Sequence, residues 1–439
     1  MTTTALIRRM VIHGGRVIDP SVKLDGAFDL LVEQGRIAAV EKPGSFDSTP
    51  DAERINAKGL LVVPGLIDIH VHLREPGQEW KETILTGSQA AVAGGFTTLC
   101  CMPNTNPIND HAQVTEFMLK QAGAAGLVQI HPIGAITVGS AGQTLAPLLE
   151  LREAGCIAFS DDGKPVGDAG VMRKALEYCL MFGAVCACHE EEKSLSAEFS
   201  MNESALSLKL GLKGMPGAAE DVMISRDIEL ARLTGGRVHF CHVSTARAVT
   251  LIRRAKEDGI PVTAEVAPHH FTLTEDACAD YNTSAKMSMP LRREDDRQAL
   301  IAGLRDGIID CIASDHAPHE ADSKNKEFSE ASFGIIGLQT TLPLTLARVR
   351  SGDWPLTRAI EALTEKPARC LGLAAGTLRR GAEANITLID PERKLKLTPE
   401  LVRSKSKNTP FLNEELQGVA VRTFYLGREV YKLESKERS

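Results

Sequence analysis

The sequence predicts an α/β protein, built as a (β/α)₈ TIM-type barrel with a small β-sandwich domain formed from both chain ends. Two observations lead to this prediction. After Pro64, short apolar runs alternate with amphipathic stretches, which is the pattern of parallel strands covered by helices. Before Pro64, and again after residue 374, strand-like runs are separated by turn residues. The 439 residues suffice for a barrel of about 250 residues and one smaller unit.

Residues 1–63 are predicted to form the β-rich N-terminal part of this satellite domain. Two pairs of mostly apolar runs each flank a glycine-containing turn, which predicts two antiparallel hairpins. The paired runs are 10–12 with 16–18, around His13-Gly14-Gly15, and 28–32 with 36–40, around Glu33-Gln34-Gly35.

Residues 64–374 are predicted to form the barrel. The expected strands are 66–71, 96–102, 127–136, 156–160, 184–189, 237–243, 260–267 and 308–314. The expected helices include 110–122, 169–182, 218–233, 246–258 and 295–304. Gly155 and Gly307, which precede strands four and eight, are typical helix C-cap residues. An open doubly wound sheet has the same rhythm and is the competing architecture.

Residues 375–439 are predicted to be the β-rich C-terminal part of the satellite domain. Residues 385–389 and 419–432 are strand-like, and a turn at Leu426-Gly427 divides the second run. Neither chain end alone buries its apolar face, so both are expected to pack together. Residues 393–407 are polar and basic and are predicted to be a solvated surface segment.

Composition excludes several classes of function. The net charge of −7 and the pI near 6.0 argue against nucleic-acid and anionic-membrane partners. The ten cysteines form no CxxC pair and several lie in apolar runs, so buried free thiols in a cytoplasmic protein are expected. The N-terminal residues lack the apolar core of a signal peptide, and no run of 18 apolar residues predicts a membrane span.

The first candidate metal ligands are His70 and His72 at the end of the first barrel strand. Residues i and i+2 of a strand share one face, so both imidazoles point to the same place. Arg74 repeats this spacing and adds a fixed positive charge. A His-x-His pair alone more often has no ligand, so further ligands are needed elsewhere in the chain.

The ends of the other predicted strands supply such residues. In a (β/α)₈ barrel, the C-terminal ends of the strands form the active-site rim. Polar residues that fall at this rim are Asn104, Asp161, Asp162, His189, His242, Asp315 and His319. Several imidazoles and carboxylates from distant strands therefore converge, which favours a metal site.

Other polar residues receive structural interpretations. The histidines predicted to be ordinary hydrogen-bonded residues are His13, His111 and His131. His239 is expected to face the helix layer, and His269 and His270 are expected at the rim. Residues 190–192 are interpreted as a solvated run of glutamates, in which Glu190 is the candidate to orient a metal-bound imidazole.

This order of residues resembles the amidohydrolase superfamily and, over essentially the whole chain, the class I dihydroorotases of bacteria. The motifs that carry the resemblance are 64–77 (PGLIDIHVHLREPG), 102–110 (MPNTNPIND), 160–163 (SDDG), 242–245 (HVST), 314–319 (SDHAPH) and 333–337 (FGIIG).

The resemblance implies a zinc site with one or two ions per subunit. His70 and His72 would bind one zinc together with Asp315, and His189 and His242 would bind a second. The implied bridging ligand is Asp162 rather than Asp161, because the family aspartate directly precedes a glycine. Hydantoinases carry a carbamylated lysine at that place, so an aspartate favours a dihydroorotase.

The resemblance also implies an activity. Dihydroorotases reversibly hydrolyse the cyclic amide of dihydroorotate to N-carbamoyl-L-aspartate, the third step of pyrimidine biosynthesis. A metal-bound hydroxide is the implied nucleophile, since zinc lowers the pKa of bound water to about 7, and Asp315 is the implied general base and acid. The implied substrate contacts are Arg74, Asn104, His319, Phe333 and Gly334.

One motif departs from the family. Where the family has KxNPPLR after strand seven, this chain has Lys286-Met287-Ser288-Met289-Pro290-Leu291-Arg292. A looser rim is expected there.

Two alternatives stay open at this point. The chain could be another cyclic-amide hydrolase, such as an allantoinase or a dihydropyrimidinase, although Arg74 and Asn104 suit a substrate that carries a carboxylate. It could also be a non-catalytic scaffold for aspartate transcarbamoylase. Homodimer formation and association with aspartate transcarbamoylase are the macromolecular contacts that the resemblance implies.

Overall fold

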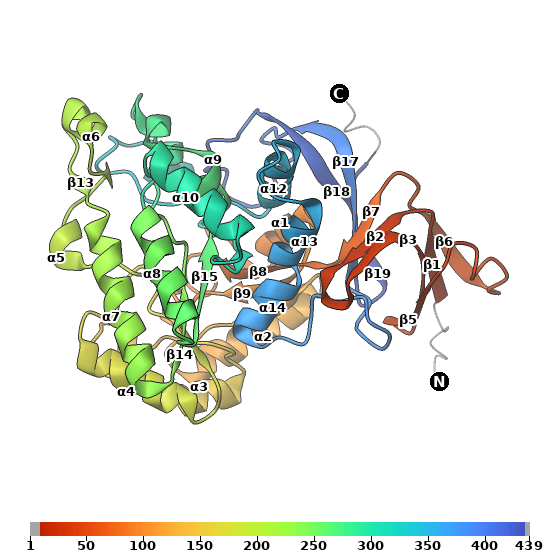
Figure 1. The fold of residues 1–439 in the computed structure, drawn as a ribbon, viewed down its shortest axis with the longest axis horizontal. Coiled ribbons are helices and arrows are strands. Elements are labelled where there is room, and N and C mark those ends of the chain that lie inside the picture. Colours follow the sequence, from red (N-terminus) through yellow and green to blue (C-terminus); the bar gives the residue numbers. More distant parts are fainter. Residues whose placement is uncertain (1–8, 435–439) are drawn as a thin grey trace.

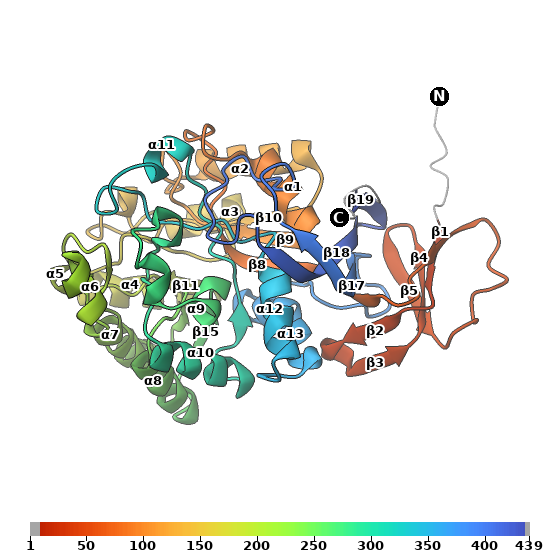
Figure 2. The same cartoon turned by 90° about the horizontal axis from the view of Figure 1, so that it is seen from above.

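The computed structural model describes residues 9–434. The N-terminal segment on which the signal-peptide prediction depends, residues 1–8, lies outside the described residues, as do residues 435–439. Helices gather around one set of strands, and strands from both chain ends gather beside them at one end of the molecule (Figures 1 and 2).

Parallel strands form the centre of the helical part. They are β8 (Leu66–Val71), β9 (Phe96–Cys101), β10 (Gln129–Pro132), β11 (Val185–Cys188), β14 (Arg237–Phe240), β15 (Val262–Val266) and β16 (Cys311–Ile312). Strands β8, β9 and β10 form one sheet, and strands β11, β14, β15 and β16 form another. Isolated parallel bridges join Gly134 to Phe159 and Phe159 to Cys186. A further bridge joins Val71 to His316, so parallel pairing leads from β16 back to β8.

The predicted fourth strand, residues 156–160, is only partly formed. Phe159 pairs on both sides, but the segment has no continuous ladder. The amide of Phe159 donates to the Val185 carbonyl at 3.0 Å, and the carbonyl of Phe159 accepts from the Ala187 amide at 2.8 Å. Residues 161–163 therefore still leave the sheet at the same edge as the ends of the other strands.

The longer helices alternate with these strands. They are α1 (Ile84–Gly94), α2 (Ala112–Ala125), α3 (Leu148–Ala154), α4 (Ala169–Leu180), α7 (Ala218–Thr234), α8 (Ala246–Glu257), α10 (Glu294–Arg305), α12 (Thr341–Arg350), α13 (Leu356–Leu363) and α14 (Glu365–Leu371). Every helix named in the sequence prediction is present within a few residues. Thr83 starts α1 with a capping box and Gly95 ends it with φ of 91°, as expected for N- and C-terminal caps.

Short elements lie in the connections. They are α5 (Lys193–Ser196), α6 (Ala205–Leu210), α9 (Pro268–Thr272), α11 (Ala321–Lys324), the strands β12 (Met201–Asn202) and β13 (Gly214–Met215), and the 3₁₀ turns η1 (Pro20–Val22), η2 (Val138–Ser140), η3 (Glu275–Cys278) and η4 (Thr283–Ala285). Most of them follow the C-terminal ends of the strands, where they surround the candidate site.

Strands from both chain ends share one sheet. Its order is β19-β18-β17-β7-β2-β3, so β7 from the N-terminal region pairs directly with β17 from the C-terminal region. The bounds are β2 (Arg16–Asp19), β3 (Leu24–Ala27), β7 (Leu61–Pro64), β17 (Ile386–Lys396), β18 (Glu415–Tyr425) and β19 (Arg428–Lys432). A second sheet has the order β5-β4-β1-β6, with β1 (Arg9–His13), β4 (Asp29–Glu33), β5 (Arg36–Glu41) and β6 (Ala52–Asn56).

A common hydrophobic core joins these two sheets. Ile12 and Leu30 from the second sheet lie in one buried cluster with Val62, Ile386 and Phe424 from the first. Strands from each end of the chain therefore bury apolar side chains against the other end.

The first predicted hairpin is wrong. β1 pairs with β4 and β6, whereas β2 pairs with β3 and β7, so the two runs lie in different sheets. The intervening glycines permit this crossing, because Gly14 has φ of 79° and a Cβ on Gly15 would lie 2.6 Å from the Val62 side chain. The second predicted hairpin, β4 with β5, and the C-terminal hairpin, β18 with β19, are confirmed.

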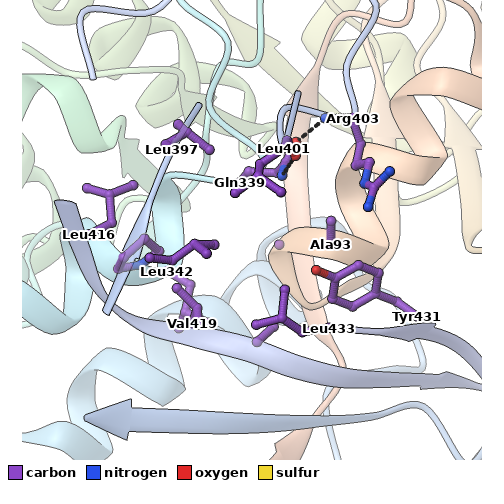
Figure 3. Close-up of a pocket in the computed structure, with 14 residues that line it drawn as sticks. Ala93, Gln339, Leu342, Leu397, Leu401, Arg403, Leu416, Val419, Tyr431 and Leu433 are labelled. Atoms are coloured by element: carbon purple, nitrogen blue, oxygen red, sulfur yellow. Dashed lines mark hydrogen bonds between the residues drawn. The ribbon is translucent and has the colours of Figure 1, made fainter. Parts of the chain in front are cut away.

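The prediction of a solvated segment at residues 393–407 is correct only for its charged side chains: Lys394, Lys396, Arg403, Lys405 and Lys407 are exposed, whereas Leu397, Val402, Ser404 and Ser406 are buried. β17 extends to Lys396, and beyond it Leu397 and Val402 are buried against Ile336. Figure 3 shows an apolar pocket beneath this segment, lined by Leu397, Leu401, Leu416, Val419 and Leu433 among others. The backbone of Arg403 closes the segment onto Gln339 with a hydrogen bond of 2.6 Å. The basic side chains hid this burial in the sequence, because their charged ends reach backbone carbonyls while their neighbours pack inward.

Two expectations from composition can be compared with the structure. All ten cysteines are free and buried, as predicted. Across residues 9–434, none of the helices combines the length and the apolar character needed to cross a membrane.

Candidate metal centre and active site

His70 and His72 face two carboxylates from distant parts of the chain. Their ring centroids are 5.4 Å apart at the end of β8. Nε2 of His70 lies 3.5 Å from Asp162 and 3.5 Å from Asp315. Nε2 of His72 lies 3.2 Å from Asp315 and 3.5 Å from Asp162. The spacing along β8 therefore brings both imidazoles to one point, and residues following two other strands meet them there.

A second pair of histidines approaches Asp162 from the other side. Nε2 of His242 lies 3.4 Å from Oδ1 of Asp162, and Nδ1 of His189 lies 3.6 Å from the same oxygen. Nδ1 of His189 and Nε2 of His242 are 3.1 Å apart. Asp162 thus lies between two pairs of imidazoles, while Asp161 turns away and accepts hydrogen bonds from the backbone of Ile136 and Thr137.

This arrangement fits a borderline-soft divalent cation such as zinc. Two ligands that each lie roughly 2.0–2.2 Å from one tetrahedral ion are about 3.4 Å apart, which matches the imidazole–carboxylate distances around Asp162. These ligand atoms form three-membered groups within 4.8 Å of one another. Nε2 of His70 is also buried with no hydrogen-bond partner among the described residues. A buried polar atom of that kind is normally paired, and a cation would pair it.

The electrostatics point in the same direction. Burial alone would lower the pKa of His70, but the carboxylates of Glu265, Asp162 and Asp315 outweigh burial and raise that pKa well above its usual value. Burial would raise the pKa of Asp162, but the surrounding imidazoles hold it well below its usual range. The centre therefore stabilises positive charge between two carboxylates, as expected for a cation site.

Three of these histidines use the ring nitrogen that faces away from the centre to donate a hydrogen bond to a neighbouring side chain. Nδ1 of His70 donates to Glu265 at 2.6 Å, and Nδ1 of His72 donates to Asn104 at 2.7 Å. His189 is reversed, because its Nε2 donates to Glu191 at 2.9 Å. Acceptors of this kind fix the tautomer and the ring orientation of metal-binding histidines.

Backbone strain gathers at the same place. Arg74, His242 and Asp315 have φ values of 61°, 33° and 47°. Non-glycine residues rarely adopt positive φ, and strain of this kind occurs where the surrounding structure holds functional side chains in place.

A cavity of about 280 Å³ opens above the centre. It is lined by the proposed metal ligands His72, Asp162, His189, His242 and Asp315, and by Arg74, Asn104, His319, Phe333 and Gly334. His70 lies behind these residues and is fully buried. The structure therefore brings the predicted site residues together around one cavity.

Arg74 supplies a buried positive charge to this cavity. Its Nε donates to the Pro318 carbonyl at 3.3 Å, and its Nη2 lies 3.4 Å from Nε2 of His319. No carboxylate lies within 4 Å of its guanidinium group among residues 9–434. A buried guanidinium without an anionic partner is suited to a carboxylate from a ligand.

Another part of the cavity lining consists of aromatic and backbone groups. The rings of Phe199 and Phe333 are 4.8 Å apart, and Nζ of Lys286 lies 4.4 Å from the Phe333 ring. Gly334 has φ of 144°, and a Cβ there would lie 2.8 Å from the Ala317 carbonyl. Only glycine fits this backbone conformation, and the amide and carbonyl of Gly334 are held by Lys286, Lys324 and Asn408.

The segment that departs from the family motif also reaches the cavity. Met287 and Ser288 line it, and Lys286 donates to the carbonyls of Phe328 and Ser329 at 2.6 Å and 2.8 Å. The looser rim stays a prediction, since these contacts describe anchoring and not motion.

The glutamates after β11 differ from their interpretation as a solvated run. Glu190 and Glu191 are each 2% exposed. The acceptor for His189 is Glu191, not Glu190. Glu190 is instead buried beside Asp227, where burial and the neighbouring carboxylate raise its pKa well above the usual value.

His239 was also assigned to the wrong face. Its Nε2 lies 3.1 Å from Glu265 and its Nδ1 lies 2.8 Å from Thr263. It therefore faces the inside of the strand array, beneath His70, because Glu265 binds both histidines. His269 and His270 are buried at the predicted rim but do not line the cavity.

Sequence reasoning missed Glu265, Glu191, Lys193 and Phe199. Glu265 had a detectable signal, since a lone carboxylate inside the apolar run 260–267 requires a buried partner. Lys193 and Phe199 follow β11 without a pattern that marks them as cavity residues.

Comparisons with known proteins test the resemblance to a family. Residues 59–248 match a family model described as dihydro-orotase-like. A dihydroorotase of Geotalea daltonii is 50% identical over 421 residues, covering 96% of this chain and 99% of the relative. A dihydroorotase of Anaeromyxobacter dehalogenans is 49% identical over 425 residues, covering 96% of this chain and 98% of the relative.

Solved structures of related enzymes share the fold. An L-hydantoinase from Arthrobacter aurescens superimposes with a TM-score of 0.86 at 25% identity, covering 97% of this chain and 96% of the other. A dihydropyrimidinase from Brevibacillus agri gives a TM-score of 0.82 at 22% identity, covering 97% of this chain and 95% of the other. Sequence identity to the full-length relatives decides the family, and the resemblance seen in the motifs is confirmed: the chain belongs to the dihydroorotases.

Proposed function

We propose that this protein is a zinc-dependent dihydroorotase, which reversibly hydrolyses the ring amide of dihydroorotate to N-carbamoyl-L-aspartate in pyrimidine biosynthesis. The observation that carries the proposal is one cavity lined both by clustered imidazoles and carboxylates and by the guanidinium of Arg74, which has no anionic partner among residues 9–434. The near-full-length identity of about 50% to named dihydroorotases supports the same activity.

The proposed metal ligands are His70, His72, Asp162, His189, His242 and Asp315. In this proposal Asp162 bridges two sites, which accommodates one or two zinc ions per subunit. When bound, zinc acts as a Lewis acid toward the amide carbonyl and makes water acidic enough to react at neutral pH.

Asp315 is proposed to carry the proton. Nearby imidazoles outweigh the effect of burial and lower the pKa of Asp315 below its usual value, so the side chain is a carboxylate that is ready to accept. In hydrolysis it would take a proton from the attacking water and deliver it to the ring nitrogen as the amide bond breaks. In ring closure it would take that proton back from the carbamoyl nitrogen.

The remaining cavity residues are proposed to hold the substrate. Arg74, with Asn104 and His319 beside it, would bind the carboxylate of dihydroorotate through charge-assisted hydrogen bonds. The main chain of Phe333 would bind the edge of the ring amide, and Gly334, whose own amide and carbonyl are already hydrogen-bonded, would hold that segment against the cavity. Burial and the adjacent cations Arg74 and Lys81 lower the pKa of His319 to about 2, so His319 would act as a neutral hydrogen-bonding group.

A substrate panel tests this proposal. The purified protein would be assayed with L-dihydroorotate, allantoin, dihydrouracil and hydantoin, each with and without a chelator. The proposal expects dihydroorotate to be the preferred substrate by at least about 100-fold in kcat/KM, because only its carboxylate pairs the buried charge of Arg74. Preference for allantoin or dihydrouracil would instead favour the other cyclic-amide hydrolases. No turnover of any of them, at full metal content, would favour the scaffold of aspartate transcarbamoylase.

The architecture is part of the proposal. We propose that residues 64–374 form the (β/α)₈ barrel and that residues 9–63 and 375–434, the described parts of the predicted segments 1–63 and 375–439, together form a β-sandwich satellite domain. Support comes from the parallel pairing that leads from β8 through β16 back to Val71, and from the core shared by the strands of both ends. Cooperative unfolding of residues 9–63 with 386–432 in hydrogen exchange would test the satellite domain.

We further propose a cytoplasmic location, a homodimer, and association with aspartate transcarbamoylase. Ten buried free cysteines support a reducing compartment. Light scattering on the purified protein, alone and mixed with aspartate transcarbamoylase from the same organism, would measure both assemblies.

A further inference from the structure

His189 differs from the other histidines of the centre in the nitrogen that it presents. His70 and His72 direct Nε2 toward the carboxylates, whereas His189 directs Nδ1 toward Asp162 and His242. Nδ1 of an imidazole is two bonds closer to the backbone than Nε2. A histidine that presents Nδ1 to a ligand therefore needs a different orientation of its ring. Some group must hold that ring from the opposite side.

Glu191 occupies that position and is itself fully engaged. Oε2 of Glu191 accepts from Nε2 of His189 at 2.9 Å and from Nζ of Lys193 at 2.6 Å. Oε1 accepts from Oγ of Ser196 at 2.5 Å. The residue is 2% exposed, so its carboxylate is not simply a partner for a surface lysine.

The short helix α5 explains how the carboxylate is held. Lys193 and Ser196 are its first and last residues and are three positions apart, so they lie on the same face. That face covers Glu191. The next residue, Glu192, plays a separate part, because its side chain caps α5 by accepting from the Ser194 amide at 3.0 Å.

We propose that Glu191 is a positioning residue that fixes the ring of His189 with Nδ1 toward the metal centre, and that Lys193 and Ser196 hold Glu191 in place. The inference rests on the proposed function, since it assigns to Glu191 a role toward zinc. It differs from the prediction made for Glu190, whose carboxylate has no hydrogen-bond partner among the described groups and does not bind His189.

Loss of the Glu191 carboxylate should therefore weaken the binding of the metal. A carboxylate behind an imidazole makes the imidazole a stronger ligand and prevents rotation of the ring, and its loss typically lowers metal affinity about 10- to 100-fold. The glutamine in Glu191→Gln keeps the shape but removes the charge. Ser196→Ala leaves Glu191 in place with one contact fewer, so a smaller loss is expected.

Two measurements that do not use turnover test the proposal. The first is zinc affinity by competition with a chromophoric chelator, and the second is the tautomer of His189 by ¹⁵N–¹H correlation of the imidazole in zinc-depleted protein. The expected results are a 10- to 100-fold weaker zinc affinity in Glu191→Gln and loss of the Nε2-protonated tautomer at His189 in Glu191→Leu, which has no acceptor. Glu192→Gln is the matched control, because it removes a neighbouring charge while the glutamine oxygen can still accept from the Ser194 amide, so neither quantity should change.

The outcomes are separable. Unchanged zinc affinity in Glu191→Gln and an unchanged His189 tautomer in Glu191→Leu, with folding verified by circular dichroism, would overturn the proposal. Equal losses in Glu192→Gln would also overturn it, because the loss of any neighbouring negative charge would then explain the effect. If the expected losses occur in a protein that does not hydrolyse dihydroorotate, the proposed function fails while the role of Glu191 stands.

Discussion

Nδ1 of His70 lies 2.6 Å from Oε1 of Glu265, although β15, which carries Glu265, provides none of the proposed metal ligands. The other oxygen of Glu265 lies 3.1 Å from His239 on β14. Strand β15, which provides no proposed metal ligand, thus supports the metal centre through the hydrogen bond from His70 to Glu265. This contact links the packing of the strands to the orientation of His70.

Replacing Glu265 by glutamine should weaken metal binding. The substitution removes the charge that supports His70 and leaves His239 beside a neutral amide, so zinc affinity is expected to fall about 10- to 100-fold. Chelator competition measures the change. Asp29→Asn is a control for the loss of a buried carboxylate, because Asp29 accepts from the Gly14 and Gly44 amides far from the centre. A similar loss of zinc affinity in both variants would contradict the account.

Asp315→Asn should abolish most of the activity. Asparagine cannot accept a proton from water, and loss of a general base typically lowers kcat by about 10²- to 10⁴-fold. Zinc content is measured in the same samples, since Asp315 is also a proposed ligand. Asp310→Asn offers a comparison, because Asp310 binds Lys256 at 2.6 Å and does not line the cavity. Activity within a few-fold of wild type in Asp315→Asn would be incompatible with the proposed proton transfer.

Arg74→Lys should act mainly on substrate binding. Lysine keeps the charge but loses the planar pair of donors, and hydrogen bonds to charged groups contribute about 1.5–3 kcal/mol. The expected result is an increase in KM for dihydroorotate of about 10- to 100-fold. Steady-state kinetics in both directions provides the measurement, and an unchanged KM would remove Arg74 from the carboxylate site.

His319 should make the folded protein more sensitive to acid. Burial, with help from Arg74 and Lys81, lowers its pKa from 6.5 to about 2. Below pH 6.5 the unfolded chain therefore binds a proton that the folded chain does not, so stability falls as the pH falls. The contribution reaches at most about 1.4 kcal/mol per pH unit. Urea unfolding at pH 7 and pH 5 should show a smaller acid loss in His319→Gln than in wild type. Equal losses would show that His319 titrates normally.

Residues at the ends of strands could be predicted from the sequence because their geometry is local. The His-x-His spacing fixes the common face of His70 and His72, and the predicted range 66–71 coincides with β8. Asp162, His189, His242 and Asp315 could be placed because parallel strands all end at one edge. The motifs that resemble dihydroorotases then separated Asp162 from Asp161.

Contacts between strands could not be predicted in the same way. The partners of His239 depend on the register of β14 with β15, where His239 lies opposite Thr263, and no local pattern encodes that register. The placement of β1 and β2 in different sheets likewise depends on pairing with strands that are distant in the sequence. Glu191 was overlooked because a run of three acidic residues resembles a solvated surface until α5 is seen to cover it.

The most direct test is a zinc titration of the chelator-treated protein, followed by the cyclisation of N-carbamoyl-L-aspartate at each step. The account predicts that activity is lost on zinc removal, rises linearly with added zinc, and reaches a plateau at one or two equivalents per chain. Full activity in protein that retains less than about a tenth of an equivalent of metal would contradict the assignment of these histidines and aspartates as a catalytic zinc centre.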